Sequence, residues 1–317
     1  KHRLLIHPDL LLAGPKDCMP DIRASSAAYL RNRGAASRFL FIRSIRKLVL
    51  RFDPSMYQGD ETGYTKAVSL LSALSEELEE FERITAEGGV SDDIEKKTAG
   101  IVSQADKLET GAMYDAIPVS MIRKIASWSH LAPYGKKKIV IIERADRMQD
   151  SARNAFLKIL EEPPKDVVFI LTTSRRGAIM PTILSRVRTY GFISRPLDVQ
   201  QSVITRVFHD VPGEAETLDQ YFSRFLPVEP KVINGSAEDF LKLVLRDAAA
   251  EGFEPPRSLN QLLAVNASDG SIPELVSSLN KCKPEIIWRK FLSSVNSLLS
   301  QSLRSGDSGP RDTVVFS

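Results

Sequence analysis

Residues 136–171 read KKKIVIIERADRMQDSARNAFLKILEEPPKDVVFIL, and this stretch decides the fold. Two continuous apolar runs, Ile139–Ile142 and Val167–Leu171, have the length and composition of parallel strands that are buried on both faces. Between them, apolar residues recur at helical spacing from Ala152 to Leu160, and Pro163-Pro164 ends the predicted helix. A strand, a helix and a second strand in this order form a βαβ unit with a right-handed crossover. The stretch therefore predicts a parallel sheet.

Further elements extend this unit in both directions. A short strand is predicted at Arg3–Ile6, and a third central strand at Val187–Phe192 after a short helix at Ile179–Ser185. Apolar residues at three- and four-residue steps in Val68–Phe81 and Ile94–Leu108 predict a helical hairpin. Helices are also predicted after Pro196, at residues 198–209, 218–225, 237–250, 258–267, 272–279 and 285–303.

A basic segment, Arg38–Phe52, has apolar residues at helical spacing and also carries Arg43, Arg46, Lys47 and Arg51. We interpret it first as a surface helix with a solvated basic face. Binding of a phosphate backbone by the same face is the alternative.

Composition narrows the classes of protein further. The chain has 317 residues, 43% of them hydrophobic, and a formal net charge of +3, which permits contact with nucleic acid without arguing for it. No apolar run approaches the roughly 20 residues of a membrane helix. The two cysteines, Cys18 and Cys282, have no partners at metal-ligand spacing, so we predict no zinc or other metal site. We expect a cytoplasmic protein with no membrane partner.

Several ordered motifs resemble one family, the AAA+ clamp-loader subunits of bacterial DNA polymerase III called delta-prime and gamma/tau. Ile139–Met148 resembles the family's Walker B strand, and Asn154–Pro164 the helix that follows it. Thr173 stands at the sensor 1 position, and Pro181–Val187 is similar to the Ser-Arg-Cys motif, with Val187 in place of cysteine. Two further landmarks are similar, His7-Pro8-Asp9 and residues 117–123.

The resemblance implies an α/β fold with an AAA+ P-loop-type parallel sheet, helices on both of its faces, and all-helical lid and collar segments after it. We expect the AAA+ core at residues 1–194 with a helical insertion at about 59–113, the lid at 195–281, and the start of the collar and a mobile tail at 282–317. In the family the phosphate-binding loop precedes the His-Pro-Asp landmark. Here that landmark is His7-Pro8-Asp9, so we expect the loop portion to be missing from this sequence.

Departures from the family indicate which subunit the chain resembles. The acidic pair of Walker B, one residue for magnesium and one to activate water, is Glu143-Arg144 here. An arginine cannot act as a base near neutral pH. Pro273 stands where the family has its sensor 2 arginine. We therefore expect a degenerate site, no bound cofactor or metal, and no catalytic activity of this chain alone.

The resemblance implies that Arg186 is the family's arginine finger, which reaches the γ-phosphate of a neighbouring subunit. The alternative is a helix-terminal arginine that satisfies local carbonyls. Glu161 and Glu162, before the Pro-Pro helix stop, are expected to face solvent, and Arg175-Arg176 follows the sensor 1 strand, where proximity to DNA is an option.

The function that the resemblance implies is that of a non-hydrolysing delta-prime-type subunit, which loads the sliding clamp in DNA replication. Its partners would be gamma/tau-type and delta-type subunits, the clamp and primer-template DNA, with ATP and magnesium on the neighbouring subunits. Two alternatives stay open. One is a gamma/tau-type ATPase cut off before its phosphate loop, and the other a basic nucleic-acid-binding module.

Overall fold

A computed structural model describes residues 5, 7–57, 61–86, 91–226, 228–252, 271–279 and 284–304 of the protein. The described residues are mostly helical and contain one three-stranded parallel sheet. The chain divides into two compact units, Lys1–Leu218 and Asp219–Ser317. Among the described residues, no helix is both long enough and apolar enough to cross a membrane.

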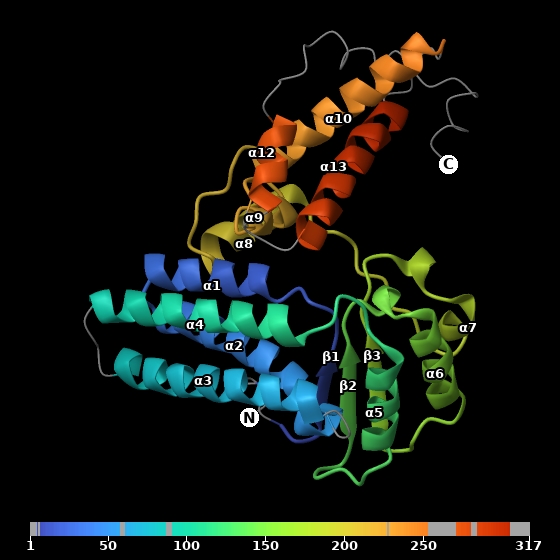
Figure 1. Ribbon diagram of the computed structural model, residues 1–317. Coiled ribbons are helices and arrows are strands. Elements are labelled where there is room, and N and C mark those ends of the chain that lie inside the picture. The colour runs from blue at the N-terminus through green and yellow to red at the C-terminus, as the bar shows by residue number, and fades with distance from the viewer. Residues whose placement is uncertain are drawn as a thin grey trace. The chain divides into compact units, whose positions relative to one another are not determined.

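The sheet lies in the first unit and has the strand order β1 (Leu10–Ala13), β2 (Lys138–Ile142), β3 (Val167–Leu171), as Figure 1 shows. Val140 of β2 is the register partner of both Leu11 and Phe169. α6 (Asp150–Glu161) connects β2 to β3, which pair in parallel. The predicted βαβ unit is confirmed.

One face of the sheet is buried, and the other is buried at Leu12 of β1 but partly exposed at β2 and β3. α5 (Val119–Ser129) and α6 cover the first face, and their core includes Val140, Ile142 and Phe156. On the opposite face Ile139, Val168 and Ile170 are 36%, 40% and 42% exposed. The prediction of helices on both faces is therefore wrong for β2 and β3 in the described part of the chain, where no helix packs over these three side chains.

Two other strands were predicted, at Arg3–Ile6 and at residues 187–192. The segment Arg3–Ile6 lies largely outside the described residues, and the strand next to β2 forms after the His-Pro-Asp landmark, at Leu10–Ala13. Residues 187–192 form no strand, and Phe192 and Ile193 are exposed. A strand needs a neighbour for its N–H and C=O groups, and this segment pairs with no described strand.

Four helices form a bundle beside the sheet, on the β1 side (Figure 1). They are α1 (Met19–Arg31), α2 (Ala35–Val49), α3 (Glu61–Ala86) and α4 (Ser91–Ala112). Their core is distinct from that of the sheet, and in it the Phe81 ring packs edge-on against Tyr29 and Phe41, with centroids 5.4 Å from each. The predicted hairpin corresponds to α3 and α4, which share this core with α1 and α2.

Short elements complete the first unit. They are the 3-10 helices η2 (Leu50–Phe52), η3 (Pro54–Tyr57), η4 (Ala145–Arg147) and η5 (Arg176–Ala178), and the helices α7 (Pro181–Leu184) and α8 (Leu197–Val207).

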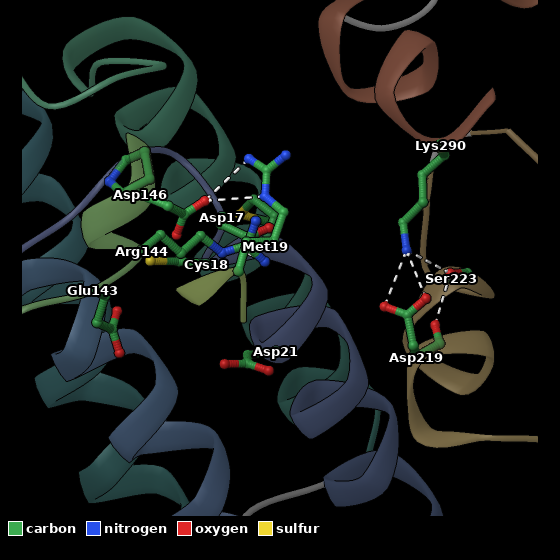
Figure 2. Close-up of polar contacts among 12 residues, drawn as sticks. Asp17, Cys18, Met19, Asp21, Glu143, Arg144, Asp146, Asp219, Ser223 and Lys290 are labelled. Carbon is green, nitrogen blue, oxygen red and sulfur yellow. Dashed lines mark hydrogen bonds and ion pairs between the residues drawn. The ribbon is translucent and has the colours of Figure 1, made fainter. Parts of the chain in front are cut away.

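The second unit is built around α10 (Pro230–Ala250), which packs on α12 (Ser271–Ser278) and α13 (Pro284–Arg304). Its core contains Ile233, Leu275 and Phe291, so α13 of the predicted collar shares a core with helices of the predicted lid. Lys290 of α13 donates to Asp219 and Ser223 of α9 (Leu218–Ser223) at 3.1 Å (Figure 2). The predicted helix at 258–267 lies outside the described residues, and the predicted boundary between lid and collar stays a prediction.

Candidate functional site

Glu143 begins the loop after β2, and its carboxylate is shared by two cations. The Lys47 ammonium lies 3.0 Å from Oε1, and the Arg51 guanidinium donates to Oε2. Arg51 is buried and also donates to the Pro15 carbonyl at 2.9 Å. A Cβ on Gly14 would lie 2.6 Å from Arg51 Nη1, so glycine leaves the space that this guanidinium occupies. Both oxygens of the Glu143 carboxylate are thus engaged.

The basic residues that reach this site come from the segment that we interpreted as a solvated face. Burial acts to lower the pKa of Lys47, but the Glu143 and Asp21 carboxylates outweigh it and hold the pKa above its ordinary value. Arg46 pairs with Glu82 of α3, and Arg51 is buried. The first interpretation was therefore wrong for most of the segment, because carboxylates from distant parts of the sequence draw these side chains inward.

Arg144 follows Glu143 directly and was predicted to stand where the family has its water-activating acid. Its backbone is left-handed, with φ of 50°, a conformation that is uncommon for residues other than glycine. The side chain pairs with Asp17, in the loop before α1, and Figure 2 shows Arg144 close to Asp17 and Cys18. Arg144 therefore supplies a third ion pair at the end of β2 and no base.

Asp146 in η4 connects the ends of β2 and β3. Thr173, the predicted sensor 1 residue, donates to its Oδ1 at 2.8 Å, and the Arg175 guanidinium donates to Oδ2 at 3.1 Å. Burial acts to raise the pKa of the Asp146 carboxyl, but these hydrogen bonds outweigh it and hold the pKa below its ordinary value. Thr173 and Arg175 are thus both engaged within the chain.

A buried carboxylate that the sequence did not predict lies next to these residues. Glu109 of α4 is 3% exposed and accepts the backbone N–H groups of Cys18 and Met19 at 3.1 and 2.9 Å. It therefore caps the amino end of α1, where the helix dipole favours a negative group. Burial raises the pKa of the Glu109 carboxyl to about 7.

These contacts limit what the end of the sheet can do chemically. A magnesium-nucleotide centre needs a carboxylate that is available to the metal shell and a second one to activate water. Glu143, Asp146 and Asp17 each have a cationic partner, and Arg144, which cannot act as a base near neutral pH, is itself paired. Within the described ranges, no three His, Cys, Asp or Glu side chains gather as metal ligands. The residues present do not fit a bound magnesium nucleotide.

Arg186 lies elsewhere, just after α7. Its Nη1 donates to the Thr182 carbonyl at 2.9 Å, and its Nη2 to Glu161 Oε1 at the end of α6, also at 2.9 Å. The Arg186 side chain is 35% exposed and the Glu161 side chain 53% exposed. Of the predicted site residues, the structure brings Glu143, Arg144 and Thr173 to the carboxyl ends of neighbouring strands, and it places Arg186 on a half-exposed surface.

Comparison with known proteins finds relatives of the central region of this chain. Residues 67–195 match a family model described as DNA polymerase III, delta subunit. The delta' subunit of Pseudomonas aeruginosa is 34% identical over 115 residues, which are 36% of this chain and 30% of that protein. The delta' subunit of Bacillus subtilis is 45% identical over 56 residues, 18% of this chain and 17% of that protein.

The chain thus spans less than a third of these curated relatives' length. A solved structure of a DNA polymerase III gamma-subunit-related protein from Thermotoga maritima covers 63% of this chain and 70% of its own, at 21% identity. Its TM-score of 0.27 is too low to support a statement about the fold. The matched central region is thus similar to the delta' subunits of DNA polymerase III.

Proposed function

We propose that this chain is a non-hydrolysing, delta'-type subunit of the DNA polymerase III clamp loader. The observation that carries the proposal is the set of ion pairs at the end of β2, where Lys47 and Arg51 hold Glu143 and where Arg144 replaces the base. A chain with this centre does not activate water, so its role is to complete an assembly whose other members hydrolyse ATP. The partners are gamma/tau-type and delta-type subunits, the sliding clamp and primer-template DNA.

Arg186 acts in trans as the arginine finger of this assembly. A planar guanidinium bridges two phosphate oxygens and stabilises the charge that grows on the γ-phosphoryl group in the transition state. The half-exposed position of Arg186 after α7 supports this role, because the side chain needs no unfolding to meet a neighbour. Its two contacts within the chain leave further N–H groups of the guanidinium for phosphate oxygens.

The alternatives have less support. A gamma/tau-type motor needs the Walker B acids, and this chain has the engaged Glu143 and Arg144 in their place. A basic nucleic-acid-binding module needs a free cationic face, whereas Arg46, Lys47 and Arg51 pair within the chain.

ATP turnover in a reconstituted clamp loader tests the proposal. The assembly contains the chain, delta-type and gamma/tau-type subunits, the clamp and primed DNA, and the motor subunits carry alanine at their own fingers so that turnover depends on Arg186. A finger typically contributes roughly 10³–10⁵ in rate, so Arg186→Ala should abolish the turnover that the chain supports while the complex still assembles. The control is Arg188→Ala, two residues away, where the guanidinium lies over its own Tyr190 ring. If the Arg186→Ala variant supports the same turnover as the parent, Arg186 does not act as an arginine finger.

A further inference from the structure

A carboxylate from a different helix contacts the guanidinium of Arg186. Glu161 is the last residue of α6, and its Oε1 lies 2.9 Å from Nη2. The Thr182 carbonyl of α7 accepts from Nη1 at the same distance. Two different nitrogens of one guanidinium are therefore held by two different helices.

The sequence determines where α6 ends, at the Glu161 carboxylate, and where α7 begins, before Arg186. Pro163-Pro164 prevents α6 from continuing past Glu161 and Glu162, and Pro181 begins α7. Ile159, two residues before Glu161, and Ile183, three residues before Arg186, are buried in the same core. The backbone positions of the carboxylate and of the arginine are thus set by packing that does not involve the ion pair.

An arginine that acts on a neighbouring subunit must adopt one of many side-chain conformations before it can meet a phosphate. Freezing such a long side chain costs conformational entropy. A contact that holds the guanidinium in advance reduces this cost at the moment of reaction. With Nη1 and Nη2 each giving one hydrogen to the chain, Nε–H and the second hydrogen of each terminal nitrogen stay available.

We propose that Glu161 is a positioning residue for Arg186, which orients the guanidinium toward the γ-phosphate of the neighbouring subunit. This inference rests on the proposed function of Arg186. The pair is solvent-exposed on both sides, and exposed pairs contribute little to stability. Loss of Glu161 should therefore change the reaction and leave folding and assembly intact.

The chain offers a matched control at the next residue. Glu162 has the same side chain, is also exposed, and makes no ion pair with another described residue. Its removal changes the charge of this surface by the same amount as removal of Glu161, but it leaves the guanidinium contact in place.

The test is carried out in the complete clamp loader with finger-less motor subunits described above. We expect Glu161→Ala to lower kcat for ATP on the order of tenfold, with unchanged KM and unchanged assembly, because the arginine is misplaced without loss of nucleotide binding. Glu161→Gln should retain most of the turnover, since its amide oxygen still accepts from Nη2. Glu162→Ala should match the parent. Glu161→Ala combined with Arg186→Ala should be no slower than Arg186→Ala alone.

The outcomes separate the two proposals. Parental turnover with Arg186→Ala overturns the finger, and the positioning role fails with it. A loss with Arg186→Ala but parental or faster turnover with Glu161→Ala overturns the positioning role alone, and a faster rate would identify Glu161 as a competitor of phosphate. Equal losses with Glu161→Ala and Glu162→Ala would attribute the effect to surface charge and also overturn it.

Discussion

At the scale of single residues, Glu109 makes the stability of the folded chain depend on pH. Its raised pKa means that the folded chain keeps this proton up to about pH 7, whereas the unfolded chain releases it near 4.5. The unfolded state is thus favoured increasingly between these two values, and stability falls as pH rises through that window. Below 4.5 both states are protonated and the contribution is complete.

Replacement of the Glu109 carboxyl should remove its contribution to the pH dependence of stability. Glu109→Gln cannot titrate but still accepts one backbone N–H with its amide oxygen. We expect the variant and the parent to have similar stability near pH 4.5, and the variant to be more stable at pH 8 by at most about 3 kcal/mol. Urea unfolding at several pH values measures this difference. Identical pH dependences of the unfolding free energy in parent and variant would show that Glu109 has no such effect. The control is Glu162→Gln, at an exposed position.

Contacts of this kind could not be predicted from the sequence. Glu109 and Cys18 are 91 residues apart, and Arg51 and Glu143 are 92 apart. Periodicity reports the local element and the face on which a residue lies, but not which distant residue meets it. The motif positions Glu143, Arg144 and Thr173 could be placed at strand ends, because each lies within two residues of the end of an apolar run. Their partners Lys47 and Asp17 required the tertiary structure.

At the scale of elements, the predictions succeeded where an element is determined by its own sequence. β2, β3 and α6 have clear apolar runs and a proline stop, and the structure has them. β1 was not predicted, because the apolar run Leu10–Ala13 is short and only its pairing with β2 identifies it as a strand. The run at 187–192 has strand composition, but a strand also requires a neighbour.

The bundle of α1 to α4 should behave as a cooperative element. Phe81 is fully buried between the rings of Tyr29 and Phe41. Phe81→Ala should destabilise the bundle by about 3–5 kcal/mol through the cavity that it leaves. Native-state amide exchange should then be faster in α1 to α4 than in the parent, with β2 and α6 nearly unchanged.

The matched control for this experiment is Phe39→Ala. Phe39 lies on α2 close to Phe41 and is exposed, so its truncation should have little effect. Equal acceleration in β2 and α6 with Phe81→Ala would show that the bundle and the sheet unfold together, contrary to the separate cores described above.

At the scale of the whole molecule, the second unit has a core of its own. Phe291 of α13 is buried, stacks on Trp288 with a centroid distance of 5.4 Å, and meets the edge of Phe240 at 5.6 Å. Phe291→Ala should destabilise this unit by about 3–5 kcal/mol and accelerate amide exchange in α10 and α13. Exchange in α6 of the first unit should stay at the parental rate, and Leu292→Ala, at an exposed neighbouring position, is the control. Acceleration in α6 of similar size would mean that the two units unfold as one.

The buried thiol of Cys18 can report how often the amino end of α1 opens to solvent. The side chain is 1% exposed, and burial raises its pKa to about 12, so the folded state offers an alkylating reagent neither access nor a thiolate. The chain's other cysteine is Cys282, and its replacement by serine leaves one thiol in the molecule. The alkylation rate of Cys18 then measures how often the amino end of α1 opens, and no probe has to be added to the protein.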